Sequence, residues 1–235
     1  MNRIFLVLTI IVILFHSCEK ESENPNTTYF LTDTFTDIRD GKIYNTIKIG
    51  EQWWMSENLA YLPNVDSSKN GSSSIPYYYV YGFEGNDSIE AKRTINYLTY
   101  GVLYNWPAAL LSCPEGWHIP TENEWNELAE YISDNKGPYT NYGSHWMEVG
   151  KHLKSTKDWA DNGNGSDDFG FRGLPGGFRS AAGGFYHHTK IGIWWESAID
   201  TDIIGYTRGL YSINSNLGRA GGRAYGRSIR CIKDY

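Results

Sequence analysis

Glycine clusters divide the last third of the chain into segments that are too short for helices. From Asp158 onward, short apolar stretches are separated by glycines at Gly163, Gly165, Gly176-Gly177, Gly183-Gly184 and Gly221-Gly222. Because glycine weakens helices and favours tight turns, this pattern predicts several short strands and hairpins. The chain has 25 Gly, nine Trp and 18 Tyr, a composition that favours an irregular β-rich fold with an aromatic core.

Two segments upstream have the apolar periodicity of helices. Thr121 and Glu124 form a capping box, in which each side chain satisfies a backbone N–H at the start of a helix. An apolar stripe follows the capping box at Trp125, Leu128, Ala129 and Ile132. The same spacing predicts a second helix from Ser144 to about Lys154.

Strand-like segments lie on both sides of these helices. The run Lys42–Ile49 alternates apolar and polar residues, and Asp40-Gly41 before it is typical of a two-residue hairpin turn. Further strands are predicted at residues 52–55, 77–81, 100–106 and 228–232, with a long polar loop over residues 63–94. Strands, two helices and then more strands predict an α+β fold.

The first residues have the three parts of an export signal. Arg3 is basic, Ile4–Phe15 is apolar except for Thr9, and His16-Ser17-Cys18 follows. An apolar run of about 12 residues is too short for a membrane-spanning helix, which needs about 20. The Phe15–Cys18 end resembles a lipobox, although Phe15 and His16 depart from its commonest form. We expect a signal peptide at residues 1–17 and an acylated, palmitate-type anchor at Cys18. An ordinary signal peptide with an incidental cysteine is the alternative.

Residues 18–34 are expected to form the lipid anchor and a solvated tether, because they lack apolar periodicity. Glu19–Glu23 is acidic, and this stretch resembles the signal that sends Bacteroidota-type lipoproteins to the outer surface of the outer membrane. The expected location is therefore the outer membrane, with the domain lipid-anchored at the cell surface. A tether that faces the periplasm is the alternative.

Residues 35–235 are expected to form one domain. Cys113 and Cys231 are its only cysteines, and two cysteines in an exported domain most simply form a disulfide. Such a bond would close a loop of about 119 residues and stabilise the fold by about 4–5 kcal/mol in the chain-entropy model. Two buried free thiols are the alternative.

Six sequence blocks carry a resemblance to a known family. They are Asp37–Tyr44, Gln52–Leu59, Tyr100–Trp106, Cys113–Thr121, Leu174–Gly177 and Ser228–Cys231. Their sequences and their order, over about residues 35–233, resemble the Fibrobacter succinogenes major paralogous domain. Two features depart from that family. Glu196 replaces a usual Ser, and a Tyr-rich insertion lies between Leu59 and Tyr100.

This family is similar in turn to the C-type-lectin-like and formylglycine-generating-enzyme fold group. The resemblance implies two helices packed on short, twisted, mostly antiparallel strands with long Gly-rich loops. It also implies a disulfide between a cysteine before the first helix and one in the last strand, which Cys113 and Cys231 would form.

The tryptophans and one histidine in these blocks have two interpretations each. A tryptophan can be a sugar-stacking platform, but in a structural block it more often packs in the core. We expect core positions for Trp53, Trp54, Trp106, Trp117, Trp125, Trp194 and Trp195. For His118, which lies between Trp117 and Ile119, we expect a packed, hydrogen-bonded histidine and not a ligand-binding residue.

Neither a resident metal nor an active site is predicted. Calcium takes about six to eight oxygen ligands, and oxygen-rich side chains occur at Asp158, Asp161, Asn162, Asn164, Asp167 and Asp168. Their spacing does not match an EF-hand, so a solvated loop is expected and Ca²⁺ is the alternative. The copper oxidases of the fold group use two nearby C-terminal cysteines, whereas only Cys231 lies there. We therefore do not expect an enzyme, and such an oxidase is a remote alternative.

The segment Arg179–Gly226 has the composition of an adaptable binding surface. Its glycine framework carries Tyr, His, Asn and Arg, which combine rigid contact area with hydrogen bonding. The segment also resembles the variable region of lectin-fold proteins that retroelements diversify. The residues expected to bind a ligand are Tyr186, His187, His188, Tyr206, Tyr211, Arg219, Arg223 and Tyr225.

Together these features predict a surface binding or adhesion module for an extracellular glycan or protein. A structural envelope protein without a small ligand is the alternative. The net charge is −6 and no basic block stands out, which argues against nucleic acid as a partner.

Overall fold

The computed structural model describes residues 30–143, 145–197, 205–221 and 225–235. The predicted signal peptide, Cys18 and the predicted tether up to residue 29 lie outside these ranges, as does Arg223. Within the described ranges, no helix is long and apolar enough to cross a membrane. The described residues form several small antiparallel sheets and a few helices, which confirms the α+β class.

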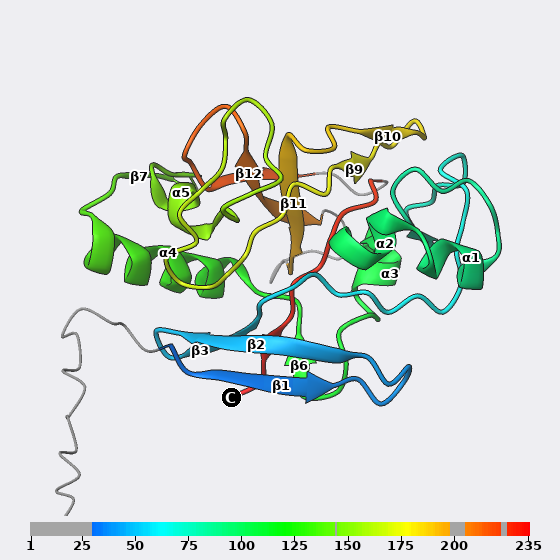
Figure 1. Cartoon of the computed structure of the whole chain (residues 1–235), viewed down its shortest axis with the longest axis horizontal. Helices are drawn as coiled ribbons and strands as arrows, with labels where there is room; N and C mark the ends of the chain where they lie inside the picture. The colour runs from blue at the N-terminus through cyan, green and yellow to red at the C-terminus, as the bar shows by residue number, and fades with distance from the viewer. Residues whose placement is uncertain (1–29, 144, 198–204, 222–224) are drawn as a thin grey trace, which may run out of the picture.

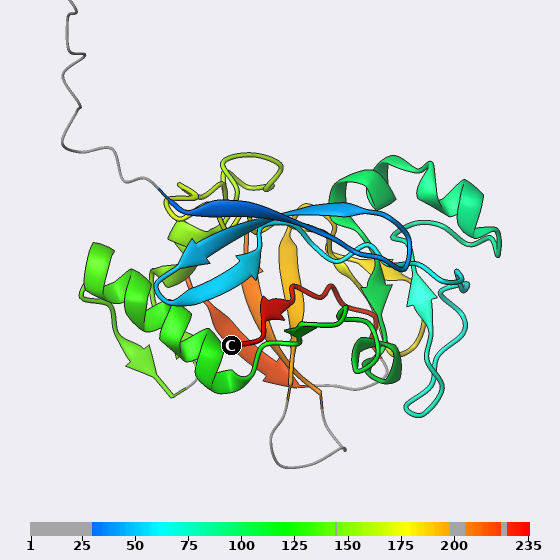
Figure 2. The same cartoon turned by 90° about the horizontal axis from the view of Figure 1, so that it is seen from below.

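The lower layer in Figure 1 is a five-stranded antiparallel sheet in the order β1-β2-β3-β14-β6. Its strands are β1 (Thr32–Thr36), β2 (Ile43–Ile49), β3 (Gln52–Met55), β14 (Ile232–Lys233) and β6 (Trp117–His118). Figure 2 shows the last strand, in red, lying between strands from much earlier in the chain. The sheet therefore forms only when both ends of the domain are present. Its first strand begins at Thr32, before the predicted domain start at residue 35.

The upper layer contains a three-stranded antiparallel sheet, β11-β12-β13. Its strands are β11 (Ile191–Glu196), β12 (Tyr206–Tyr211) and β13 (Gly218–Gly221). Three two-stranded pairs complete the strands: β4 (Tyr78–Tyr79) with β5 (Leu103–Tyr104), β7 (Asn141–Tyr142) with β8 (His145–Trp146), and β9 (Phe178–Arg179) with β10 (Phe185–Tyr186). The Gly-rich last third thus forms short strands, as its punctuation predicts.

The longest described helix is α4 (Glu122–Lys136), and it begins where the capping box predicts. The Glu124 carboxylate accepts from the Thr121 N–H at 2.7 Å, and the Thr121 hydroxyl accepts from the Glu124 N–H at 3.2 Å. The predicted stripe of Trp125, Leu128, Ala129 and Ile132 is buried. A capping box and an apolar stripe in register are local signals, so this helix is confirmed.

The second predicted helix is wrong over its first half. The helix α5 covers only Val149–Leu153, and His145–Trp146 forms β8 instead. Trp146 exchanges backbone hydrogen bonds with Leu217, at 2.9 and 3.0 Å. Glu148 has a left-handed φ of 60° and separates the two elements. Tertiary pairing with Leu217 therefore overrides the helical spacing of Trp146.

Three further helices lie in a region where the sequence predicted strands and loop. They are α1 (Ser88–Lys92), α2 (Ile95–Tyr100) and α3 (Trp106–Ala109). Each has a side-chain N-cap, from Asp87, Thr94 and Asn105 respectively. Helices of four to six residues are too short to show an apolar period, so only their caps could have indicated them.

Two predicted strand features also differ in detail. Gly41 has the positive φ of 75° that a turn requires, but the loop runs over residues 37–42 and is longer than two residues. At the C-terminus only Ile232–Lys233 is a strand, while Ser228 makes an isolated bridge to Trp194. These differences change the lengths of the elements and leave their order intact.

The core has two apolar clusters. One lies around Tyr44, Trp106 and Trp195, and the other around Trp54, Trp125 and Trp194. Six of the seven tryptophans predicted to be core are at most 7% exposed, and they are Trp54, Trp106, Trp117, Trp125, Trp194 and Trp195. Trp53 is half-buried instead, and its side chain lies on the opposite face of β3 from that of Trp54.

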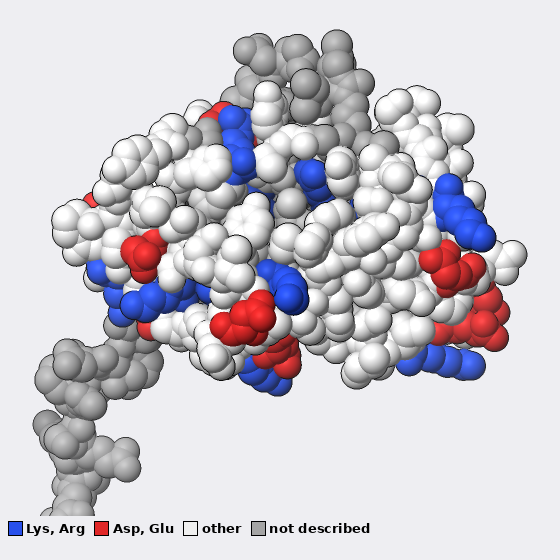
Figure 3. Space-filling model, turned by 90° about the horizontal axis from the view of Figure 1, so that it is seen from above, with Lys and Arg blue, Asp and Glu red and all other residues white. Residues whose placement is uncertain are grey.

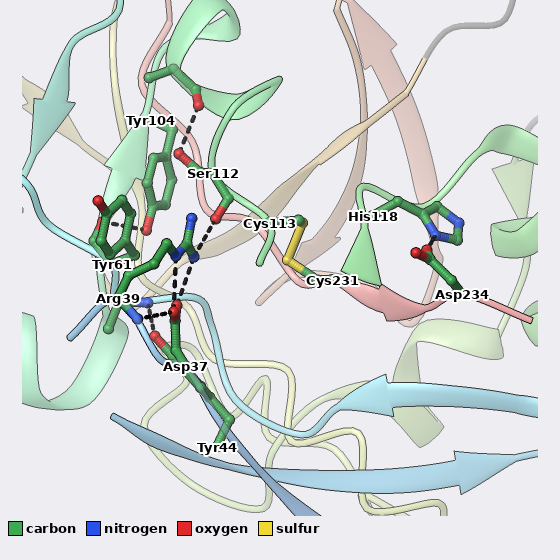
Figure 4. The surroundings of a disulfide bond; sticks show 12 residues. Asp37, Arg39, Tyr44, Tyr61, Tyr104, Ser112, Cys113, His118, Cys231 and Asp234 are labelled. Atoms are coloured by element: carbon green, nitrogen blue, oxygen red, sulfur yellow. Dashed lines mark hydrogen bonds and ion pairs between the residues drawn. A yellow bond between two sulfur atoms is a disulfide. The ribbon is translucent and has the colours of Figure 1, made fainter. Parts of the chain in front are cut away.

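The predicted disulfide is present between Cys113 and Cys231. Figure 4 shows it beside a hydrogen-bonded group that holds the β1–β2 loop. There the Arg39 guanidinium donates to the Asp37 carboxylate at 2.6 Å and to the carbonyl oxygen of Ser112 at 2.8 Å. Since Ser112 precedes Cys113, the disulfide, the first hairpin and the last strand are tied at one place.

Removing the disulfide is expected to destabilise the domain strongly. In the double variant Cys113→Ala/Cys231→Ala, the unfolding free energy in guanidinium chloride is expected to fall by about 2–5 kcal/mol, because the chain between the two cysteines regains its freedom when unfolded. Dithiothreitol should lower the wild-type midpoint to that of the double variant and leave the variant unchanged. Equal midpoints for oxidised and reduced wild type would contradict this prediction.

Candidate functional site

The predicted binding segment is built around the backbone of residues 226–228. Gly226 exchanges both backbone hydrogen bonds with Arg179 of β9, and Arg227 does the same with Tyr104 of β5. The carbonyl oxygen of Ser228 accepts from the N–H of Trp195 in β11 at 3.0 Å. These three residues thus join β9, β5 and β11, and they give the side chains on either side of them fixed positions.

Three of the predicted binding residues gather around Phe178, at the start of β9. The ring centroid of Phe178 lies 6.3 Å from that of Tyr186, 5.5 Å from that of His187 and 5.9 Å from that of Tyr225. We call Phe178, Tyr186, His187 and Tyr225 the aromatic cluster. Tyr186 is 51% exposed and His187 is also exposed, so the cluster presents aromatic surface to solvent. Such surface is typical of ligand-binding faces.

Arg227 lies against this cluster although the sequence did not indicate it. Its guanidinium carbon is 4.7 Å from the ring centroid of Tyr225 and 4.8 Å from that of Trp195. The residue is 5% exposed. Burial lowers the pKa of Arg227 to about 10, so the guanidinium is still charged at neutral pH.

Tyr206 and Arg219 lie on the opposite face of the three-stranded sheet from Tyr211. The register pairs Tyr206 with Glu196 and Arg208 with Arg219, and directly paired side chains share a face. The guanidinium carbon of Arg219 lies 4.0 Å from the Tyr206 ring centroid. The predicted binding residues therefore do not form one surface.

The face with Tyr206 and Arg219 contains a buried ion-pair group. The Glu196 carboxylate accepts from Arg208 Nε at 2.6 Å and from Arg219 Nη2 at 2.7 Å. Glu196 and Arg208 are both fully buried. Arg219 also pairs with Glu122 at the start of α4, at 3.0 Å. Glu196, which departs from the usual serine, therefore neutralises arginines in the interior and leaves Arg219 occupied.

Tyr211 and His188 are held by packing. Gly209 and Gly218 face each other across β12 and β13, and a Cβ on Gly209 would lie 2.8 Å from the Tyr211 hydroxyl oxygen. The ring of Tyr211 therefore covers a strip of sheet that only glycine leaves open. His188 stacks on Tyr81 at 4.9 Å between ring centroids, and burial lowers its pKa. His188 is thus a half-buried supporting residue behind the cluster.

Oxygen-bearing side chains of the 158–168 loop form hydrogen bonds with different residues of the domain and do not converge on one point. Asp161 Oδ2 accepts from the Ser212 hydroxyl at 2.9 Å, and Asp167 Oδ1 accepts from the Arg172 N–H. Asp168 Oδ2 lies against His152 Nδ1, and Asn164 Oδ1 accepts from the Trp159 N–H. Across the ranges that the structure describes, no group of three or more His, Cys, Asp or Glu could hold a metal ion.

His118 is hydrogen-bonded on both ring nitrogens, as expected of a packed histidine. Its Nε2 lies 2.8 Å from Glu124 Oε1, and its Nδ1 lies 2.6 Å from Asp234 Oδ1. The bond to Glu124 raises the pKa of His118, although burial opposes the rise. Burial acts against ionisation of Glu124 as well, but hydrogen bonds from His118 and Thr121 outweigh it and lower the Glu124 pKa.

Sequence reasoning therefore found three members of the cluster and missed Phe178 and Arg227. Phe178 directly follows Gly176-Gly177, and Arg227 directly follows Tyr225-Gly226. The same glycine-framed pattern that indicated Tyr225 extends to both residues. A local signal for them was therefore present, but their convergence depends on the pairing of residues 226–228 with β9.

The fold and the site define an α+β domain closed by one disulfide, with an aromatic surface on its C-terminal loops. A sequence model of the Fibrobacter succinogenes major domain matches residues 47–233, and the chain belongs to that family. No curated protein and no solved structure matches the chain.

Restoring the family's serine at position 196 is expected to destabilise the domain. Glu196→Ser leaves Arg208 buried without its carboxylate partner, and breaking a buried ion pair costs about 3–5 kcal/mol. Chemical denaturation measures the loss. The double variant Glu196→Ser/Arg208→Met should recover part of it, since the uncompensated charge is then removed. If Glu196→Ser is as stable as the wild type, Glu196 does not neutralise these arginines.

His118 is expected to make stability fall at alkaline pH. Because its folded-state pKa is raised, its contribution is complete below the unfolded value of about 6.5 and is lost as the pH rises through the folded-state value. The wild type should therefore lose more unfolding free energy between about pH 6 and pH 9 than His118→Gln. His145→Gln, at an exposed position, is the matched control. Identical pH profiles for wild type and His118→Gln would contradict the assignment.

Proposed function

We propose that this chain is a lipid-anchored outer-membrane protein whose C-terminal loops bind a glycan or protein outside the cell. The observation that carries the proposal is the aromatic cluster, in which exposed rings of Tyr186 and His187 pack on Phe178 beside Tyr225. Rigid aromatic side chains on glycine-framed turns lose little entropy on binding and give much contact area.

The proposal includes a C-type-lectin-like fold and an anchor at Cys18. The first is supported by the order of the elements and by a disulfide that joins Cys113, upstream of β6 and α4, to Cys231, directly before the last strand. The second is supported by the basic, apolar and cysteine-ended parts of the N-terminal sequence. An acidic tether and the absence of a catalytic motif in the sequence favour a displayed binding module over an enzyme.

Replacing three exposed or half-exposed cluster residues is expected to abolish ligand binding. A glycan-array screen and a pull-down with the full-length protein in detergent would first identify ligands. In Tyr186→Ala/His187→Ala/Tyr225→Ala, affinity should then fall at least about tenfold, because the contact surface is lost while the core is intact. Circular dichroism should show that the variant remains folded.

Two controls test the remaining parts of the proposal. Tyr142→Ala, at another exposed tyrosine, should bind like the wild type. Cells that produce Cys18→Ala should lose the protein from the outer membrane. If no ligand binds and deletion leaves cell adhesion unchanged, a structural envelope role replaces the proposed one. If binding survives the triple substitution, the binding face lies elsewhere.

A further inference from the structure

Arg227 is a buried arginine without a partner for two of its nitrogen atoms. Its Nε and Nη1 atoms are buried, and neither has a hydrogen-bond partner among the described residues. Leaving a buried charged donor unpaired is costly, so each such group requires a specific explanation. A buried, unpaired cation therefore indicates that its partner comes from outside the described part of the chain.

Arg230, in the same segment, has acceptors for both of its terminal nitrogens, although its Nε also lacks a partner among the described residues. It is fully buried, and its guanidinium carbon lies 4.3 Å from the ring centroid of Phe171. Its terminal nitrogens donate to the carbonyl oxygen of Phe171 and to Asn58 Oδ1, the latter at 2.9 Å. Arg227 is likewise packed on aromatic rings, but no acceptor among the described residues pairs with its Nε or its terminal Nη1. Aromatic packing alone therefore does not account for the charge at position 227.

The rings beside Arg227 leave only certain chemistry for a ligand. Tyr225 and Trp195 each lie within 5 Å of the guanidinium carbon, at 4.7 and 4.8 Å. When rings pack on the faces of a guanidinium, its N–H groups can donate only within the guanidinium plane. Two parallel N–H groups in that plane match the two oxygens of a carboxylate. Trp106, whose ring centroid lies 5.3 Å from that of Trp195, also has a buried Nε1 donor without a partner among the described residues. All the orphan atoms beside Trp195 are donors, so the ligand must supply acceptors.

Basic side chains gather on the face of the molecule that Figure 3 shows. Figure 3, seen from above, shows Lys and Arg side chains in a hollow at the centre of the face, while most visible Asp and Glu lie towards its edges. The neighbouring Arg208 and Arg219 are paired with Glu196, and Arg179 donates to the carbonyl oxygens of Ser68 and Asn70. Of these four arginines, Arg227 is the one with buried side-chain nitrogens that lack a partner among the described residues.

We propose that the C-terminal loops bind an acidic sugar, a uronic-acid-type residue whose carboxylate pairs with Arg227 while its ring packs on Tyr225 and the aromatic cluster. This proposal rests on the proposed function and names its ligand class. A sugar fits better than an acidic protein, because a protein interface needs about 800 Å² per partner with an apolar centre. The cluster instead offers a few aromatic rings, of which Tyr186 is the most exposed, around one charge.

Calorimetric titration of the full-length protein in detergent with D-glucuronate tests this assignment. D-glucose and the methyl ester of glucuronate serve as uncharged probes. Glucuronate should bind at least about tenfold more tightly than either, since a charge-assisted hydrogen bond contributes about 1.5–3 kcal/mol. Arg227→Met should lose this preference without a lower melting temperature, because it removes an unpaired buried charge. Arg172→Met, at an exposed arginine, should leave affinity within about twofold, as expected for a substitution of an exposed side chain.

A second variant distinguishes a loss of binding from misfolding of Arg227→Met. Arg227→Lys keeps the charge but not the planar fork, so glucuronate affinity should fall at least about fivefold while the protein stays folded. If glucuronate and glucose bind alike, or if Arg227→Met leaves the preference unchanged, the inference is overturned. If a tetraglutamate peptide binds through Arg227 and glucuronate does not, the ligand class is wrong.

The same titrations separate failure of this inference from failure of the proposed function. A neutral glycan or a protein that binds through Tyr186, His187 and Tyr225 without any effect of Arg227→Met would overturn only the acidic-sugar assignment. If glucuronate, neutral glycans and envelope proteins all fail to bind the full-length protein, the binding function itself is wrong, and the acidic-sugar assignment fails with it.

Discussion

The backbone of residues 226–233 is the element on which the other elements depend. In succession it hydrogen-bonds to β9 through Gly226, to β5 through Arg227, to β11 through Ser228 and to β3 and β6 through Ile232. Cys231 adds the covalent link to residue 113 in the same stretch. Contacts of such long range close large loops, so the upper and lower layers become ordered together and not as separate units.

This central position explains why the segment contains buried arginines. Residues of a segment packed on several sides have few routes to solvent, so long side chains at positions 227 and 230 must remain inside. Arg230 finds carbonyl and amide oxygens and packs on Phe171. Arg208, in the adjacent sheet, requires the Glu196 carboxylate. Burial lowers the pKa of Arg208 and of Arg230, and the Glu196 carboxylate opposes this shift at Arg208.

Local signals made part of this fold predictable from sequence. The capping box at Thr121 and the stripe beginning at Trp125 fixed the start and the buried face of α4, because both act within a few residues. The pairing of Trp146 with Leu217 lies far apart in sequence and could not be deduced from spacing. The same holds for the site. Tyr225 was recognisable from its glycine-framed turn, whereas the opposite faces of Tyr206 and Tyr211 follow from their lying in one uninterrupted strand, β12, whose bounds the glycine pattern does not mark.

The contrast between Glu196 and Arg227 links the two faces of the upper sheet. On one face an acidic residue replaces the family's usual serine and neutralises Arg208 and Arg219, so those cations are internal and unavailable to a ligand. Beside the other face, Arg227 has no such residue within the described chain. A protein that compensates two buried cations with a dedicated carboxylate has the means to compensate a third. The unpaired cation next to exposed aromatic rings is therefore better explained by an external carboxylate than by imperfect packing.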